Sequence, residues 1–249
     1  MLIQLHHDKC DPRSTTDAFV ANGVLSTLSD PDKQLLRART RYCVVPSESV
    51  LCNRDCDEEQ IYFPLRGVVS FVTELPDGKS ITSAMIGTGG TVGSLSALGL
   101  QRSFAKVVVD IQLQAICIPM PRLLEILPTT PTLKSALARD AEKLIRHLLQ
   151  ISACAALHPI EKRVARVLLQ AADCIDNNVV PLTQERMAQM LGAQRTTVNL
   201  VLNTMASVGV VRTNRGRVEI IDRSELQEHA CECYADIRST HCPLSVSQR

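Results

Sequence analysis

The sequence contains no tryptophan, and only three tyrosines and four phenylalanines among its 249 residues. Proteins that bind single-stranded nucleic acid stack the bases on aromatic side chains, so this composition argues against such a surface. The chain also has no excess of either charge, because 27 lysines and arginines oppose 26 aspartates and glutamates. This balance excludes a histone-like polybasic chain and equally an acidic tail protein.

Long apolar runs are absent as well. No stretch approaches the roughly 20 residues that a helix needs to cross a bilayer. The N-terminus, MLIQLHHDKC, lacks the basic start and the apolar segment of a secretory signal. We therefore expect a cytoplasmic protein with no membrane partner. The length and the 45% hydrophobic content are typical of a folded chain with more than one domain.

Ten cysteines are present, but none is spaced as Cys-x-x-Cys. Without a secretory signal a disulfide framework is disfavoured, and most of these cysteines are expected to be small buried residues. Two groups could contribute metal ligands or a redox pair, namely Cys231 and Cys233 with Cys242, and Cys52 with Cys56. Each group lacks a full ligand set, so the sequence predicts no metal site.

The first half of the chain has the pattern of a β domain. Residues 1–18 are polar and aperiodic and are expected to be a flexible leader. Between Arg41 and Ile118, short β-type runs alternate with turn residues; Pro76-Asp77-Gly78-Lys79 supplies a hairpin turn between VVSFVTEL and SITSAMI. The loop GTGGTVGS follows, and FAKVVVDIQLQAICI reads as two further runs. Residues 19–130 are therefore predicted to form a β-sandwich or jelly-roll barrel.

Residues 131–157 have a helical pattern without glycine or internal proline, and Pro131 suits a helix start. Apolar residues recur at spacings of 4, 3, 4, 3 and 4, which is a heptad pattern that favours a parallel dimer helix. Ile145 and Leu149 lie beside this seam and are expected to cover the β domain. A helix that only packs on its own domain is the alternative. The predicted seam consists of Leu137, Ala141, Leu144, Leu148, Ile151 and Ala155.

The segment 158–235 predicts a winged helix-turn-helix. His158-Pro159 breaks the preceding helix and is the expected hinge. TQERMAQML, with Thr183 as N-cap, ends at Gly192, and AQRTTVNLVLNTMASVG follows at once, which is the spacing of a helix-turn-helix. VVRTNRGRVEII then reads as a small hairpin, the wing. Residues 236–249 are expected to be a polar tail.

The second helix of this pair has an apolar face and a polar face at 100° per residue. Arginine suits guanine and asparagine suits adenine in the major groove, so the polar face predicts base contacts by Arg195, Thr196, Asn199 and Asn203. Gln194 and Thr197 lie next to them. Thr183, Arg215 and Arg217 are expected to contact the phosphate backbone. Charge agrees, because residues 158–217 carry a net charge of +4 while residues 218–249 carry −3.

These residues carry a family resemblance. LTQERMAQMLGAQRTTVNLVLNTMASVGVVRTNRGRVEI resembles the DNA-binding domain of the Crp/Fnr family of bacterial transcription regulators, and IYFPLRGVVSFV, DGKSI and GTGGTVG resemble its β-roll sensor domain. The resemblance covers about residues 20–235. It implies a homodimer that reads two DNA half-sites about one turn apart, and RNA polymerase as a further partner. Arg195 falls on the family's base-reading arginine, whereas Thr196 and Leu200 depart from residues common there, so the operator is expected to differ.

The resemblance also bears on the effector. In cyclic-nucleotide-binding members a loop carries Gly-Glu and, about ten residues later, Arg-Ser or Arg-Thr. Here the candidate pocket residues are Gly93, Ser94, Arg102 and Ser103, with Ser94 in place of the glutamate and a spacing about two residues short. Cyclic-nucleotide binding is therefore disfavoured. An iron–sulfur cluster lacks a full ligand set, since the oxygen-sensing members use an N-terminal cysteine cluster and this chain has only Cys10 there. A haem lacks axial ligands, since every histidine lies outside the β domain. The effector stays unassigned.

Enzyme motifs are incomplete. The β domain has no histidine between Lys9 and Arg146, which excludes a cupin-type metal centre, and neither a phosphate loop nor a nucleophile elbow is complete. We predict an α+β protein with a β-roll (jelly-roll, cyclic-nucleotide-binding-like) sensor domain, a dimerisation helix and a winged helix-turn-helix. Its predicted function is transcription regulation as a DNA-binding homodimer. The rival is a ligand-binding or redox-sensing module of the same fold without sequence-specific DNA binding.

Overall fold

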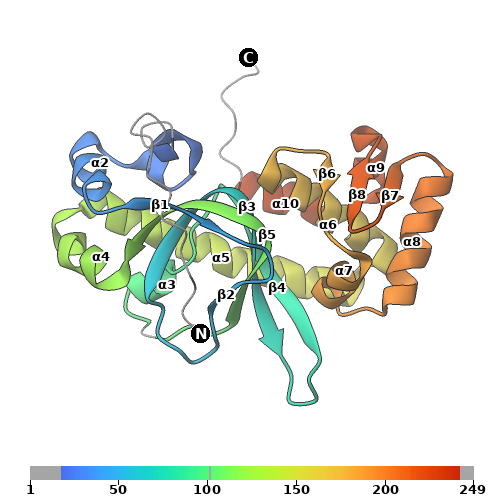
Figure 1. Ribbon diagram of the computed structural model, residues 1–249, viewed down its shortest axis with the longest axis horizontal. Helices are drawn as coiled ribbons and strands as arrows, with labels where there is room; N and C mark the ends of the chain where they lie inside the picture. Colours follow the sequence, from blue (N-terminus) through green and yellow to red (C-terminus); the bar gives the residue numbers. More distant parts are fainter. Residues whose placement is uncertain (1–17, 101, 242–249) are drawn as a thin grey trace.

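The computed structural model describes residues 18–100 and 102–241. Its elements follow one long axis, with α2 (Asp30–Arg37) and α4 (Met120–Ile126) at one end and α8 (Arg195–Ser207) at the other (Figure 1). A β-sheet domain precedes a mainly helical one, as the α+β prediction requires. Within the described part of the chain, no helix has both the length and the apolar character needed to cross a membrane.

The sheet of the N-terminal domain has five antiparallel strands. These are β1 (Arg41–Val45), β2 (Val50–Cys52), β3 (Gln60–Glu74), β4 (Ser80–Ile86) and β5 (Lys106–Pro119). Their order is β1-β5-β3-β4, and β2 pairs with the far end of β5. The Pro76–Lys79 turn joins β3 to β4, with Gly78 at φ +83°, a conformation that favours glycine. The predicted jelly-roll-type β domain is confirmed.

Two expectations about the strands were wrong in detail. The runs IYFPL and VVSFVTEL belong to one 15-residue strand, β3, and the two runs expected after the glycine-rich loop are the single strand β5. Gly67 allows the two runs of β3 to form one strand. It sits at φ +110°, and an added Cβ there would lie 2.3 Å from the carbonyl oxygen of Gln112. The register shifts on both sides of Gly67 bend the strand without ending it.

Short helices precede, connect and follow the strands. They are the 3-10 helix η1 (Leu25–Thr27), α2, α3 (Ser94–Ala97), α4 and the 3-10 helix η2 (Leu127–Thr129). The long helix α5 (Pro131–Leu157) starts with Pro131 at its first position. The Asp32 carboxylate accepts the backbone N–H groups of Thr132 and Leu133 at 2.9 and 3.1 Å, so α2 supplies the cap of α5. α5 ends at Leu157 because His158 is extended before Pro159.

The C-terminal domain begins directly after this break. Its elements are α6 (Ile160–Ile175), β6 (Val179–Val180), α7 (Gln184–Leu191), α8, β7 (Val211–Asn214), β8 (Arg217–Ile220), α9 (Arg223–His229) and α10 (Cys233–His241). The three short strands form a separate antiparallel sheet in the order β6-β8-β7. α10 continues through residue 235, so the segment expected to be tail starts inside a helix. Residues 1–17, expected as a leader, lie outside the described residues.

Candidate nucleic-acid interface

α7 and α8 form a tight helical pair at the centre of the C-terminal domain. Thr183 caps α7, since its side-chain oxygen accepts the backbone N–H of Arg186 at 3.0 Å. Gly192 ends α7 at φ +61°, a conformation that costs glycine little. α8 begins at Arg195, so three residues separate the helices. This is the geometry of a helix-turn-helix.

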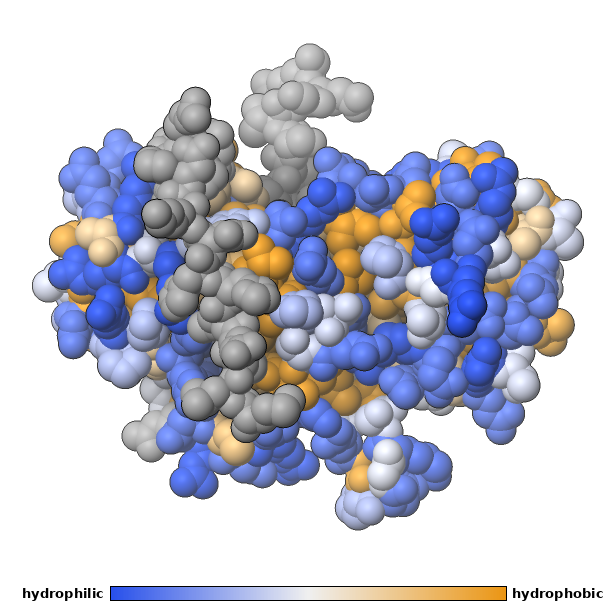
Figure 2. Space-filling model, in the orientation of Figure 1, coloured by the Kyte–Doolittle hydropathy of each residue, from blue (hydrophilic) through white to orange (hydrophobic). Residues whose placement is uncertain are grey.

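The two faces of α8 are as the sequence predicts. Val198, Val201, Leu202 and Met205 are buried in the core of the C-terminal domain. Four predicted DNA-contact residues are exposed, namely Gln194, Arg195, Thr196 and Asn203, and Thr197 and Asn199 beside them are half-buried. α8 lies at the outer end of the molecule in Figure 1, and this end of the surface is mostly hydrophilic in Figure 2. The polar face of α8 is therefore open to a large partner.

A groove lies between the beginnings of the two helices and the wing. β7 and β8 pair antiparallel, and Arg215-Gly216 forms their turn, with Gly216 at φ +75°. The groove brings together Thr183, Arg195, Arg215 and Arg217, for which the sequence predicts DNA contact. The polar residues of the lining that carry no such prediction are Gln184, Glu185, Thr213 and Asn214. Glu185 is the acidic member of this lining, and the three arginines outweigh its charge.

The basic residues of this domain are not equivalent. Arg163 donates to the Leu191 carbonyl and Arg212 pairs with Glu219, while Arg166 is buried against Gln170. Arg186 is paired as well. Among the described residues, Arg195, Arg215 and Arg217 form no ion pair. Part of the positive charge counted in residues 158–217 is therefore already engaged within the protein. Arg195, Arg215 and Arg217, which are not engaged in this way, lie together in one groove.

Arg186 joins the helix-turn-helix to the sheet. Its guanidinium donates to Asp110 of β5, with Nε 2.7 Å from the carboxylate, and the Ser70 hydroxyl donates to the same side chain. Burial raises the pKa of Asp110 above its ordinary value, while Arg186 and Ser70 act in the opposite direction. The turn at Gly192 also approaches Ile81 of β4. No sequence pattern indicates this contact, because a single arginine and a single aspartate do not reveal their pairing.

The predicted dimer seam on α5 is wrong for most of its length. Leu137, Ala141 and Leu144 are buried in the chain's own core, with Leu137 and Leu144 packed among residues of the sheet domain. Leu148 and Ile151 are half-buried against neighbouring clusters, and Ala155 is exposed. The sheet covers this face because its apolar side also needs burial, and it competes for the same stripe of leucines.

A parallel stripe on α5, displaced by one residue, is free instead. Ile145 and Leu149, which were expected to cover the β domain, are 52% and 67% exposed. They belong to an exposed series with the same heptad spacing, formed by Ala138, Glu142, Ile145, Leu149, Ser152 and Ala156. The face expected to cover the β domain is therefore exposed, and most of the predicted seam is buried or half-buried within the chain itself.

The candidate effector residues divide into two groups. Gly93, Ser94 and Ser103 line a hollow of about 10 Å³, which is room for about one water molecule. Phe104 stacks on Phe71 at 5.3 Å between ring centroids and helps to fill it. Arg102 lies outside, with its side chain 71% exposed and its Nε 3.9 Å from Asp57. The residues present do not fit a cyclic nucleotide, since neither the volume nor the phosphate-binding cation is in place.

A buried carboxyl group lies near this hollow. Asp140 of α5 accepts a hydrogen bond from Thr91, which precedes the Gly93 loop. Burial raises the pKa of Asp140 to about 6, although the hydrogen bond from Thr91 opposes the shift. The folded chain therefore holds this proton more tightly than the unfolded chain. The associated stability is present below pH 3.8 and is lost as the pH rises through about 6.

An Asp140→Asn variant should remove this pH dependence. We expect the free energy of unfolding of the wild type, relative to the variant, to fall by about 2–3 kcal/mol as the pH rises from about 4 to about 7. Urea unfolding of both proteins at several pH values measures the difference. Two stability curves that stay parallel over this range would contradict the expectation.

The metal-ligand candidates Cys231 and Cys233 are both buried, in the segment between α9 and the start of α10. Cys242 lies outside the described residues. Two further side chains, Cys154 and His158, lie beside them at the end of α5, and neither was expected to be a ligand. Their spacing of four residues, which places two side chains on one face of a helix, was the sequence signal that could have identified them as a pair of ligands.

Comparison with known proteins agrees with this arrangement. A family model for the Crp-like helix-turn-helix domain matches residues 162–229, and one for the cyclic nucleotide-binding domain matches residues 43–130. The transcriptional regulator SdrP of Thermus thermophilus is 26% identical over 180 residues, covering 69% of this chain and 84% of that protein. A CRP-like cAMP-activated global transcriptional regulator of Mycobacterium tuberculosis is 26% identical over 181 residues, covering 69% and 80%.

Solved structures show the same fold. FixK2 from Bradyrhizobium japonicum superposes with a TM-score of 0.65 at 15% sequence identity, covering 77% of this chain and 98% of that one. CLP of Xanthomonas campestris, described as responsive to c-di-GMP, superposes with a TM-score of 0.62 at 15% identity, covering 77% and 99%. These two likenesses establish the architecture, and the two family models cover both of its domains in order. The chain belongs to the Crp/Fnr family of transcriptional regulators, as a DNA-binding regulator with an N-terminal sensor domain.

Proposed function

We propose that this regulator binds duplex DNA as a homodimer and reads a sequence of two half-sites. The observation that carries the proposal is the groove between α7, α8 and the wing, where Arg195, Arg215 and Arg217 are free of ion pairs with described residues. Free arginines at such a place suit phosphate and base contacts, because their charge is not already neutralised within the protein.

The residues divide by their position in this groove. Arg195, at the start of α8, extends toward a guanine edge, and Thr196, Asn199 and Asn203 follow along the helix. Gln194 and Thr197 flank the first turn. Thr183, Arg215 and Arg217 contact the phosphate backbone on either side. Exposed Leu200, on the same face, offers contact to a thymine methyl group.

The dimer forms through the exposed stripe of α5. Ile145 and Leu149 supply apolar contact at its middle, while Ala138, Ser152 and Ala156 allow a second helix to come close. A parallel pair of α5 helices places both helix-turn-helix units at the same end of the dimer. Two copies of α8 then meet successive major grooves about one turn apart.

The remaining roles follow from family membership. The protein acts by binding rather than by catalysis, in the cytoplasm and with RNA polymerase as a partner at the promoter. The hollow at Gly93 gives no support to a cyclic nucleotide as the effector, although the mycobacterial relative is named as cAMP-activated.

Selection from a random pool of duplex DNA tests the proposal, because it requires no assumption about the operator sequence. The full chain should enrich an imperfect palindrome whose half-site centres lie about 10 base pairs apart. A pool that stays random after several rounds would favour the rival, a sensor module without sequence-specific DNA binding.

Replacing Arg217 by alanine should weaken binding to all DNA sequences alike. One phosphate contact per protomer is lost, so the slope of log affinity against log salt should fall in magnitude by about one for each contact. Binding titrations by fluorescence anisotropy at several salt concentrations measure this slope. The control is Arg122→Ala, which removes an exposed charge from α4 at the end of the molecule opposite α8 (Figure 1). An unchanged slope for Arg217→Ala would exclude the wing from the interface.

A further inference from the structure

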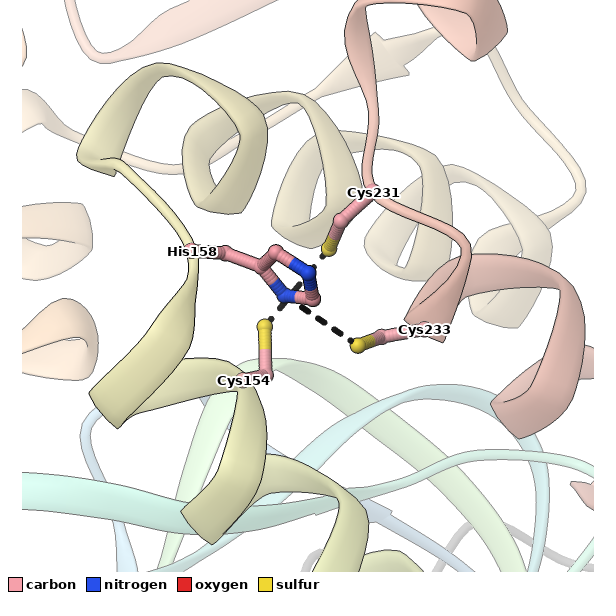
Figure 3. A group of neighbouring side chains, drawn as sticks. All are labelled: Cys154, His158, Cys231 and Cys233. Carbon is pink, nitrogen blue, oxygen red and sulfur yellow. Dashed lines mark hydrogen bonds between the residues drawn. The ribbon is translucent and has the colours of Figure 1, made fainter.

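Four side chains with metal-binding atoms converge at the junction of α5 and the C-terminal domain. Cys154 comes from the last turn of α5, His158 from the break before α6, and Cys231 and Cys233 from the segment that leads into α10 (Figure 3). Their ligand atoms all lie within 4.8 Å of one another. We propose that these residues bind one Zn²⁺ ion in a closed Cys₃His site that ties α10 to the hinge.

The distances between ligand atoms agree with a tetrahedral ion. Zn–S bonds of about 2.3 Å and Zn–N bonds of about 2.0–2.1 Å separate two sulfurs by about 3.8 Å and a sulfur from a nitrogen by about 3.6 Å. The Sγ atoms of Cys154 and Cys231 are 3.6 Å apart, and the Sγ of Cys233 is 3.5 Å from Nδ1 of His158. Two edges of the tetrahedron are therefore already formed.

The surroundings orient the ligands as zinc sites require. Nε2 of His158 lies 3.1 Å from the Glu232 carboxylate, an acceptor that places the ring proton on this nitrogen. Nδ1 is then left with a lone pair, 3.5 Å from the Cys233 sulfur. Gln150 donates its amide N–H to the Cys233 sulfur at 3.0 Å. A carboxylate behind the histidine and an N–H donor at a sulfur are the usual second contacts of such ligands.

Charge favours a negatively charged site at this place. Three thiolates with one Zn²⁺ leave a net charge of −1. Arg166 is only 4% exposed, its guanidinium donates to the neutral side chain of Gln170, and its Nε has no hydrogen-bond partner among the described residues. It interacts electrostatically with Cys154. A buried cation of this kind is stabilised by an anionic neighbour.

Other thiol chemistry fits less well. A disulfide needs its two sulfurs at about 2.05 Å, and the three cysteines are free thiols here. An iron–sulfur cluster holds its protein ligands on several iron atoms, which keeps them farther apart than the 4.8 Å within which these four ligand atoms lie. Zinc accepts the mixed sulfur and nitrogen set without redox change, and four protein ligands leave no open position for catalysis.

The position of the site suits a metal that restrains the junction between α5 and the DNA-binding domain. It joins the end of the proposed dimer helix, the break at His158-Pro159 and the helix that packs on both α5 and α6. Because α5 ends and α6 begins at this break, the backbone here sets the direction of the DNA-binding domain relative to the proposed dimer helix. Bound zinc therefore holds the hinge in one arrangement, and its loss frees the hinge. This coupling rests on the proposed DNA binding, whereas the metal site itself does not.

Zinc titration of the full chain tests the site. The protein, prepared under reducing conditions and stripped with a chelator, should take up one Zn²⁺ per chain in competition with a chromogenic chelator and in native mass spectrometry. Co²⁺ in its place should give the visible absorption of a tetrahedral thiolate complex. Cys231→Ser should lose stoichiometric binding, and Cys56→Ser, which changes an exposed cysteine of the sheet domain, should keep it.

A conservative variant guards against misfolding of Cys231→Ser. Glu232→Gln changes a side chain that is 72% exposed, and it should raise the Kd for Zn²⁺ by about 10- to 100-fold through loss of histidine orientation. A reduced wild type that stays metal-free, or one that binds zinc no better than Cys231→Ser, would overturn the site.

DNA affinity tests the coupling separately. With a duplex selected as above, the zinc-loaded protein should bind about 5- to 150-fold more tightly than the stripped protein, and the two forms of Cys231→Ser should bind alike. Stoichiometric zinc with equal DNA affinity in both forms would disprove the coupling to the hinge. Absence of DNA binding in every form would instead count against the proposed function.

Discussion

Arg195→Ala is expected to weaken strongly the preference for the selected DNA sequence. A bidentate arginine–guanine contact contributes about 1–3 kcal/mol of discrimination, so the affinity for the matched site should fall by about 5- to 150-fold per protomer contact. Affinity for unrelated duplexes should fall much less, because the groove keeps Arg215 and Arg217. Parallel titrations with the selected duplex and with a duplex of altered half-sites measure the ratio.

The choice of Arg195 follows from its environment. It lies at the surface, forms no ion pair with a described residue, and stands at the first position of α8, where its removal leaves the apolar face intact. Arg122→Ala on α4 is again the control for loss of one positive charge. If Arg195→Ala lowers the affinity for matched and altered duplexes equally, the residue contacts the backbone and does not read a base.

The double variant Ile145→Asp with Leu149→Asp is expected to convert the protein to monomers. Each aspartate would place an unpaired carboxylate in the apolar middle of the proposed helix pair. A monomer engages one half-site, so the loss of simultaneous contact should weaken operator binding by about 100-fold or more. Sedimentation velocity gives the oligomeric state and anisotropy gives the affinity.

Two controls separate the interface from the fold. Leu124→Asp introduces a charge at an exposed leucine of α4 and should leave the dimer intact. Leu144→Asp changes a side chain only 3% exposed in the chain's own core and should unfold the sheet domain, visible in circular dichroism. A dimer that persists in the double variant would show that the exposed stripe of α5 is not the interface.

The helix-turn-helix could be predicted closely, since its information is local. Thr183 as a cap, Gly192 as a terminator and the apolar face from Val198 to Met205 are set by residues within one or two turns of each other. The strands were harder to predict. β3 and β5 looked divided because Gly67 and the bulges interrupt the alternation of side chains without interrupting the pairing.

The seam of α5 shows why pattern alone misassigned a face. Two stripes of the helix, displaced by one residue, share the heptad spacing, and only one of them can lie on the sheet. The stripe with more leucines is the one that packs on the sheet, because the apolar side of the sheet must be buried within the same chain. The other stripe, centred on Ile145 and Leu149, stays exposed, and it is the one for which we propose contact with a second chain.

By itself, the sequence determined the family, the order of the two domains and the polar face of α8, because helix caps, turns and periodic apolar faces act over a few residues. The tertiary structure alone decided the free face of α5, the pairing of Arg186 with Asp110 and the meeting of Cys154 and His158 with Cys231 and Cys233. Cys154 and Cys231, for example, are 77 positions apart. Such contacts depend on how whole elements pack, and no local pattern records that.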